Sequence, residues 1–226
     1  ASRSDDMAAG TLELEGKPVT IGSPREALDA GIATVYQEVN LLPNLSVAQN
    51  LFLDRQPMRF GIVRESEMRR RARLLLADFG LDVDVAAPLG SYSVAVQHVI
   101  AIARAVDLSA RVLILDEPTA SLDRHEVEIL FGIMRQLAGR GIGIVFVSHF
   151  LDQVYEISDR ITVLRNGRLV GERETSSLPR LDLIRMMLGR ELAETTGGRA
   201  ATHGQAARTV CASFEHYGKS GYMAPF

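Results

Sequence analysis

The sequence predicts an α/β fold built around a parallel sheet. Three short apolar segments, at residues 32–36, 111–115 and 142–147, support this prediction. Helical patterns separate them, and strands that alternate with helices form parallel sheets covered on both faces. A chain of 226 residues is long enough for one domain with a normal core, with or without appendages.

Composition narrows the class of protein. Apolar residues make up 46% of the chain and charged residues 23%, which is typical of globular proteins. The net charge of −3 gives no reason to expect nucleic acid as a partner. A single cysteine, Cys211, excludes an intrachain disulfide and fits a reducing, intracellular location. No apolar run approaches the ~18 residues of a membrane span, so no direct membrane insertion is expected.

The N-terminal part predicts small elements. Residues 1–10 are polar and small and indicate a disordered end or a remnant of expression. Residues 11–21 predict a β-hairpin. The run Ser23-Pro24-Arg25-Glu26 predicts a helix start with a capping box, and Gly31 ends that helix. Residues 32–36 then predict a short buried strand.

The stretch from about 45 to 107 is predicted to be mostly helical. Ser46 and Gln49 form the pattern of a second capping box. An amphipathic pattern over residues 65–79 predicts a longer helix. Ser93 is the expected N-cap of a third helix over residues 94–106.

Beyond this stretch the alternation of strands and helices resumes. We expect strands at 111–115 and 142–147, helices at 125–137 and 150–157, and a hairpin that pairs 161–164 with 168–171 across Asn166-Gly167. The chain becomes rich in Gly, Ala, Thr and Arg after residue 190. We therefore expect one domain over 11–195 and a linker or disordered tail over 196–226.

Polar side chains follow three of the predicted strands. Asp116 and Glu117 end one strand, His149 follows a second and Gln37 a third. Ligands of parallel sheets gather at such strand ends. Mg²⁺ takes one or two carboxylates together with water and phosphate oxygens, so the acidic pair suggests a magnesium site. An acidic helix cap explains the pair alone equally well.

Ser93 marks a possible anion site. It opens its helix after Gly90-Ser91-Tyr92, so free backbone N–H groups and the positive end of the helix dipole point outward beside its hydroxyl. The alternative is an ordinary N-cap.

These residues resemble the motifs of ABC ATPases, which are P-loop NTPase-like proteins with a parallel sheet and a helical subdomain. The matching segments are 113–123 (Walker B motif and D-loop), 92–97 with 102–105 (signature helix), 36–38 (Q-loop) and 147–149 (switch histidine). The resemblance places the helical subdomain at about 45–107.

Three further segments, 16–19, 23–28 and 31–38, are similar to the N-terminal ATPase half of ribose/galactose/xylose-type sugar importers. In that group one polypeptide carries two ATPase domains. The distance from Gln37 to Ser93 suits a compact helical subdomain. It leaves no room for the long coiled coil of the relatives that act in chromosome organisation and DNA repair.

The resemblance implies ATP and Mg²⁺ as cofactors. It implies that Asp116 and Gln37 serve the metal site, that Glu117 acts on the attacking water, and that His149 contacts the γ-phosphate. Cofactor contacts are also implied for Ser93, Val94, Ala95 and Asp123, the first three toward ATP held by a second ATPase domain. The implied partners are that domain and transmembrane permease subunits, at the inner face of the cell membrane.

The phosphate-binding loop Gly-x-x-x-x-Gly-Lys-Ser/Thr is expected before residue 11 and is not found there. Gly218-Lys219-Ser220 does not replace it, because Ser213 stands where the first glycine belongs. We therefore expect an N-terminally incomplete domain, impaired on its own. The alternative function is a non-hydrolysing interaction module that lends its signature helix to a partner ATPase.

Overall fold

The computed structural model describes residues 11–36 and 41–188. The predicted N-terminal end at 1–10, Gln37 and the predicted tail at 196–226 lie outside the described residues. The chain divides into two compact units, one formed by residues 1–162 and 172–178, the other by residues 163–171 and 179–226.

A three-stranded parallel sheet lies at the centre of the first unit. Its strands are β3 (Ile32–Val35), β6 (Val112–Asp116) and β7 (Gly143–Val147), with β6 in the middle. The register pairs Ile32 with Val112 and Asp116 with Val147. The predicted parallel α/β sheet is thus confirmed.

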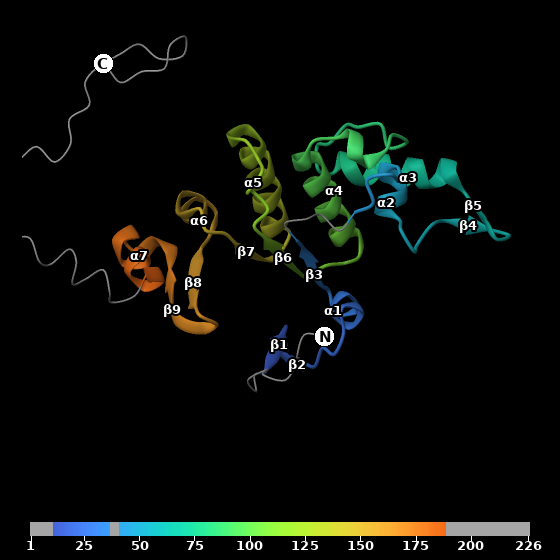
Figure 1. The fold of residues 1–226 in the computed structure, drawn as a ribbon. Helices are drawn as coiled ribbons and strands as arrows, with labels where there is room; N and C mark the ends of the chain where they lie inside the picture. The colour runs from blue at the N-terminus through green and yellow to red at the C-terminus, as the bar shows by residue number, and fades with distance from the viewer. Residues whose placement is uncertain (1–10, 37–40, 189–226) are drawn as a thin grey trace, which may run out of the picture. The chain divides into compact units, whose positions relative to one another are not determined.

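Helices cover one face of this sheet. Helix α4 (Val94–Asp107) contacts β3, and helix α5 (Arg124–Gly139) contacts both α4 and β7 (Figure 1). Leu113 and Leu115 of β6 are fully buried on the covered face. The ring of Phe131 on α5 meets that of Phe146 on β7 edge to face, with centroids 5.9 Å apart. These contacts form the apolar core beneath the strand ends.

The opposite face of the sheet differs from the prediction. The register aligns Thr34, Ile114 and Val145 on that face. Thr34 is exposed and the side chain of Val145 is 49% exposed. Within the described residues this face is thus partly exposed at β3 and β7, in contrast to the expected sheet covered on both faces.

The stretch from 45 to 107 contains the expected helices α2 (Val47–Leu51), α3 (Glu65–Ala77) and α4, and a 3₁₀ turn at Leu89–Ser91. It also contains the antiparallel β4–β5 hairpin, residues 58–63, with strands Met58–Arg59 and Ile62–Val63. The hairpin was not predicted, since strands of two residues are too short to show alternating hydrophobicity.

The N-terminal elements agree with the prediction except in one hydrogen bond. Strands β1 (Leu12–Leu14) and β2 (Lys17–Val19) pair antiparallel, and helix α1 (Pro24–Asp29) follows. Ser23 caps α1 by accepting from the N–H of Glu26. The Glu26 carboxylate accepts from the N–H of Gly22, 2.8 Å away, and from the Ser23 hydroxyl. The predicted capping box therefore closes one residue early.

The last elements follow helix α6 (Leu151–Ile157). Strands β8 (Arg160–Arg165) and β9 (Arg168–Glu174) turn at Asn166-Gly167 as predicted. A 3₁₀ turn (Thr175–Ser177) and helix α7 (Arg180–Leu188) complete the described chain, and α7 had not been predicted. Leu183 of α7 is buried in the second unit.

Candidate functional site

The ends of strands β6 and β7 bring three of the predicted site residues into one region. Because Asp116 pairs with Val147, the residues that follow each strand emerge side by side. The N–H of Glu117 donates to the carbonyl oxygen of Val147 over 2.9 Å and fixes this junction. Asp116, Glu117 and His149 therefore lie at the carboxyl edge of the sheet, where ligands of parallel sheets bind.

Glu117 and His149 form a direct contact. The Nδ1 atom of His149 lies 2.8 Å from Oε1 of Glu117. The Glu117 side chain is 23% exposed and that of His149 is 64% exposed. The second carboxylate oxygen, Oε2, is buried and has no hydrogen-bond partner among the described residues. A buried acceptor without a partner is costly, which marks this carboxylate as an unusual feature of the strand end.

The backbone of Glu117 is in the left-handed region, with φ of 48°. Residues other than glycine seldom adopt this conformation, and its occurrence is enriched at functional sites. It turns the chain sharply at the end of β6. The carboxylate consequently reaches across to His149 instead of continuing the alternation of the strand.

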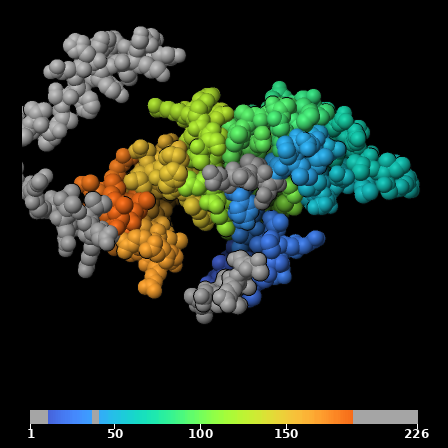
Figure 2. All heavy atoms as spheres, in the orientation of Figure 1, coloured from blue at the N-terminus to red at the C-terminus, as the bar shows by residue number. Residues whose placement is uncertain are grey.

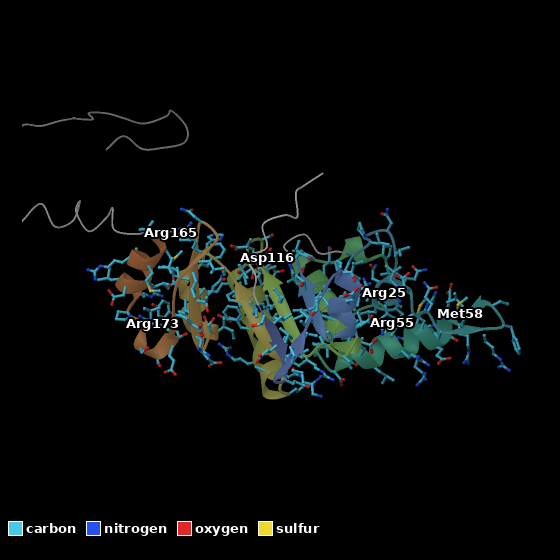
Figure 3. The ribbon with its side chains drawn as sticks, turned by 90° about the horizontal axis from the view of Figure 1, so that it is seen from below. Arg25, Arg55, Met58, Asp116, Arg165 and Arg173 are labelled. Atoms are coloured by element: carbon cyan, nitrogen blue, oxygen red, sulfur yellow. The ribbon has the colours of Figure 1, made fainter. Side chains whose placement is uncertain are left out.

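Asp116 is the group best suited to a metal. This residue, labelled in Figure 3, is half-buried, and its carboxylate forms no hydrogen bond or ion pair within the described residues. No group of three or more His, Cys, Asp or Glu side chains that could hold a metal occurs in that part of the chain. One carboxylate nevertheless fits Mg²⁺, which takes most of its ligands from water and phosphate. Gln37, the other predicted metal residue, lies outside the described residues.

Ser93, Val94 and Ala95 form a separate feature at the start of α4. The Ser93 hydroxyl accepts from the N–H of Val96 over 3.4 Å, so it caps the helix as predicted. The first N–H groups of a helix have no partner within it. Among the described residues, no hydrogen bond or ion pair joins Ser93 to Glu117 or His149.

Asp123 has a local structural contact. Its Oδ1 accepts from the N–H of Glu126 over 2.8 Å, and the N–H of Asp123 donates to Oε2 of Glu126 over 3.2 Å. This capping box begins α5. One carboxylate oxygen of Asp123 is therefore committed to the helix start.

A further contact at the site, between Thr119 and Gln153, was not predicted from the sequence. The Thr119 hydroxyl donates to Oε1 of Gln153 over 2.6 Å, and Thr119 is 3% exposed. This hydrogen bond joins the segment that follows Glu117 to helix α6, and helix α6 begins shortly after His149. The two residues lie far apart in sequence, so only the folded chain reveals the pair.

Solved structures share this fold. CbiO1 from Clostridium perfringens, described as part of an ABC transporter complex, superimposes with a TM-score of 0.63 at 24% identity, covering 84% of this chain and 76% of that chain. A nucleotide-free ATP-binding cassette from an ABC transporter gives a TM-score of 0.65 at 21% identity, over 84% and 78% of the two chains. The fold is that of an ATP-binding cassette domain.

The sequence then defines the family. A family profile described as ABC transporter matches residues 2–120, more than half of the chain. The chain belongs to the ABC transporter family of ATP-binding proteins. No helix within the described ranges is long and apolar enough to cross a membrane.

Curated relatives in this family are named as importer subunits. The galactofuranose transporter ATP-binding protein YtfR of Escherichia coli is 57% identical over 217 residues, 96% of this chain and 43% of the relative. The ribose import protein RbsA 1 of Rubrobacter xylanophilus is 48% identical over 87% of this chain and 39% of its own length. The fructose import protein FruK of Bifidobacterium longum is 50% identical over 82% and 36%. The chain thus spans less than half the length of these relatives.

Proposed function

We propose that this chain is the ATP-hydrolysing part of an ABC importer for sugars. The observation that carries the proposal is the 2.8 Å contact between Glu117 and His149 at the ends of two parallel strands, beside Asp116. The names of the relatives, all importers of sugars, support the substrate class.

Each side chain has a distinct role in this proposal. Asp116 and Gln37 serve a Mg²⁺ ion, which would neutralise phosphate charge as ATP is cleaved. Glu117 orients the attacking water with its partly exposed carboxylate and accepts its proton. His149, held by Glu117 through Nδ1, directs its Nε2 to the charge that develops on the γ-phosphate.

The start of α4 serves a second nucleotide in this proposal. Ser93 and the first N–H groups of the helix, at Val94 and Ala95, form a positive end that suits a phosphate. Since the resemblance to ABC ATPases assigns these positions to ATP held by another ATPase domain, we infer that Ser93 faces that nucleotide, with Asp123 near the junction. Permease subunits at the inner face of the membrane complete the assembly.

The sharpest test is ATP hydrolysis by a protein in which a Gly-x-x-x-x-Gly-Lys-Ser loop precedes these residues. We expect Glu117→Gln to bind Mg·ATP within about threefold of the parent and to lower turnover by about 100-fold. Asp116→Ala should abolish Mg²⁺-dependent binding. Glu128→Gln, an exposed acid on α5, is the matched control and should leave both unchanged.

Two outcomes would contradict the proposal. Unchanged turnover in Glu117→Gln would refute the role of this carboxylate. Failure of the parent protein to bind Mg·ATP would refute nucleotide hydrolysis altogether and favour a non-hydrolysing interaction module. The sugar class is tested separately, by uptake of labelled pentoses and hexoses in cells with and without the gene.

A further inference from the structure

The β4–β5 hairpin exposes three apolar side chains at one projection of the first unit. Met58 is 61% exposed, Phe60 90% and Ile62 72%. Figures 1 and 2 show the hairpin extending beyond α3 at the edge of the helical stretch, and Figure 3 labels Met58 there. Exposed apolar side chains that are grouped, rather than scattered, mark interaction sites.

The turn of this hairpin contains an unfavourable residue. Phe60 and Gly61 both have positive φ, 53° and 79°. The β8–β9 hairpin has the same conformation at Asn166 and Gly167, with 51° and 73°. Asn-Gly suits this two-residue turn, whereas an aromatic residue in the left-handed region is an outlier.

Phe60 is therefore not explained by folding. Its ring is almost fully exposed, and its one described ring contact is with the guanidinium of Arg59, 5.3 Å from the ring centroid. A bulky apolar residue that disfavours its own turn and adds nothing to the core indicates a binding role. Strained positions of this kind gather at functional sites.

The chain around the hairpin is basic although the whole protein is acidic. Residues 54–73 contain seven arginines against three acids, while the full chain has a net charge of −3. Ion pairs with Glu65 and Glu67 engage Arg64, Arg69 and Arg71. Arg59, Arg70 and Arg73 are exposed and form no ion pair within the described ranges.

We propose that the β4–β5 hairpin docks on the surface of an anionic lipid bilayer. Phe60, Met58 and Ile62 enter the boundary between headgroups and acyl chains. Arg59 lies against acidic headgroups, and the exposed arginines of α3 add electrostatic attraction to the surface. An exposed apolar tip that includes Arg59 and is followed by a helix rich in arginine is the chemistry of interfacial anchors. The contact is shallow and requires no membrane-spanning helix. It goes beyond the proposed ATPase function and requires no nucleotide.

A tryptophan at the tip gives a direct measurement, because the chain contains no tryptophan. The 226-residue chain with Phe60→Trp is mixed with vesicles of phosphatidylcholine, either alone or with about 30 mol% phosphatidylglycerol. We expect a blue shift of its emission with the anionic vesicles, weakened by high salt. Leu169→Trp, at a residue that is 64% exposed on the β8–β9 hairpin, should show no shift.

A second variant separates binding from folding. Phe60→Asn replaces the aromatic with a residue that favours the turn, so its Tm should equal or exceed that of the parent. Its binding to anionic vesicles in sedimentation should fall by about tenfold or more, because the largest apolar side chain is lost.

Unchanged binding of this variant, equal binding to neutral vesicles, or no vesicle binding by the parent would overturn the proposal. In the last case a protein partner for the hairpin is favoured. Neither readout involves ATP, so failure here is distinct from failure of the ATPase proposal.

Discussion

His98 of α4 is a buried titratable residue outside the candidate site. It is 2% exposed, and its Nδ1 lies 3.0 Å from the carbonyl oxygen of Val94. The other ring nitrogen, Nε2, is buried without a partner in the described chain. Burial lowers the pKa of His98 below its ordinary value, although the hydrogen bond to Val94 opposes this. Protonation would place a charge on an atom that has no acceptor.

This residue makes stability depend on pH. The unfolded chain binds a proton at His98 near pH 6.5, whereas the folded chain does so only at lower pH. The free energy of unfolding is therefore highest above the pKa that His98 has in the unfolded chain. It falls as the pH drops toward the lower pKa of His98 in the folded chain. Below pH 6.5 we expect the free energy of unfolding to decline by up to about 1.4 kcal/mol per pH unit from this group. Urea unfolding at about pH 7.5 and about pH 5.5 measures this decline in the free energy of unfolding.

The control for this prediction is His125, which is exposed on α5. His98→Gln should reduce the difference in stability between the two pH values, and His125→Gln should leave it unchanged. An equal reduction by both variants would show that burial of His98 is not the cause.

At the scale of elements, Asn50 holds the loop before α2. It is fully buried, and its Oδ1 accepts from the N–H of Leu42 over 2.7 Å. Its Nδ2 lies within hydrogen-bond distance of the carbonyl oxygens of Leu42, Leu45 and Ser46. We expect Asn50→Ala to lower the free energy of unfolding by about 2–3 kcal/mol, because backbone groups of the loop lose their partner. Chemical denaturation measures the loss, and exposed Asn44→Ala should change stability by less than about 0.5 kcal/mol.

Element starts were predictable where a side chain caps its own helix. Ser46 and Gln49 form both bonds of the expected capping box, and Ser93 caps α4 as expected. Each interaction spans three residues, so the local sequence contains it. Helix α7 and the β4–β5 hairpin were missed. In the hairpin, Phe60 occupies a turn position where the sequence gives no turn signal.

Contacts between residues far apart in the sequence were harder to predict. The strand-end rule predicted that Asp116, Glu117 and His149 would gather, and the parallel register confirms their proximity. The left-handed backbone of Glu117 and its buried oxygen without a partner in the described chain could not be predicted from the sequence. Both depend on how β6 and β7 align.

At the scale of the whole molecule, β7 is an open edge. It pairs only with β6 among the described strands, and its side chains Val145 and Val147 are 49% and 44% exposed. An exposed apolar edge strand tends to pair with other chains. We therefore expect the 226-residue chain to self-associate, and Val145→Lys to lower that tendency severalfold in light scattering at micromolar concentration. Ile129→Lys on α5, at a residue 48% exposed, is the control, and an equal effect would exclude the edge as the cause.

The pairing of β3 with β6 has a consequence for synthesis of the chain. Ile32 meets Val112 in the sheet, and the whole stretch from 45 to 107 lies between them. At roughly 5–20 residues per second, a ribosome needs about 4–16 seconds to deliver β6 after β3. The helices α2, α3 and α4 contact one another and can assemble during that interval, while β3 still lacks its partner β6. Substitutions that slow this helical assembly, such as Asn50→Ala, should therefore reduce the soluble yield of the protein more than its final stability suggests.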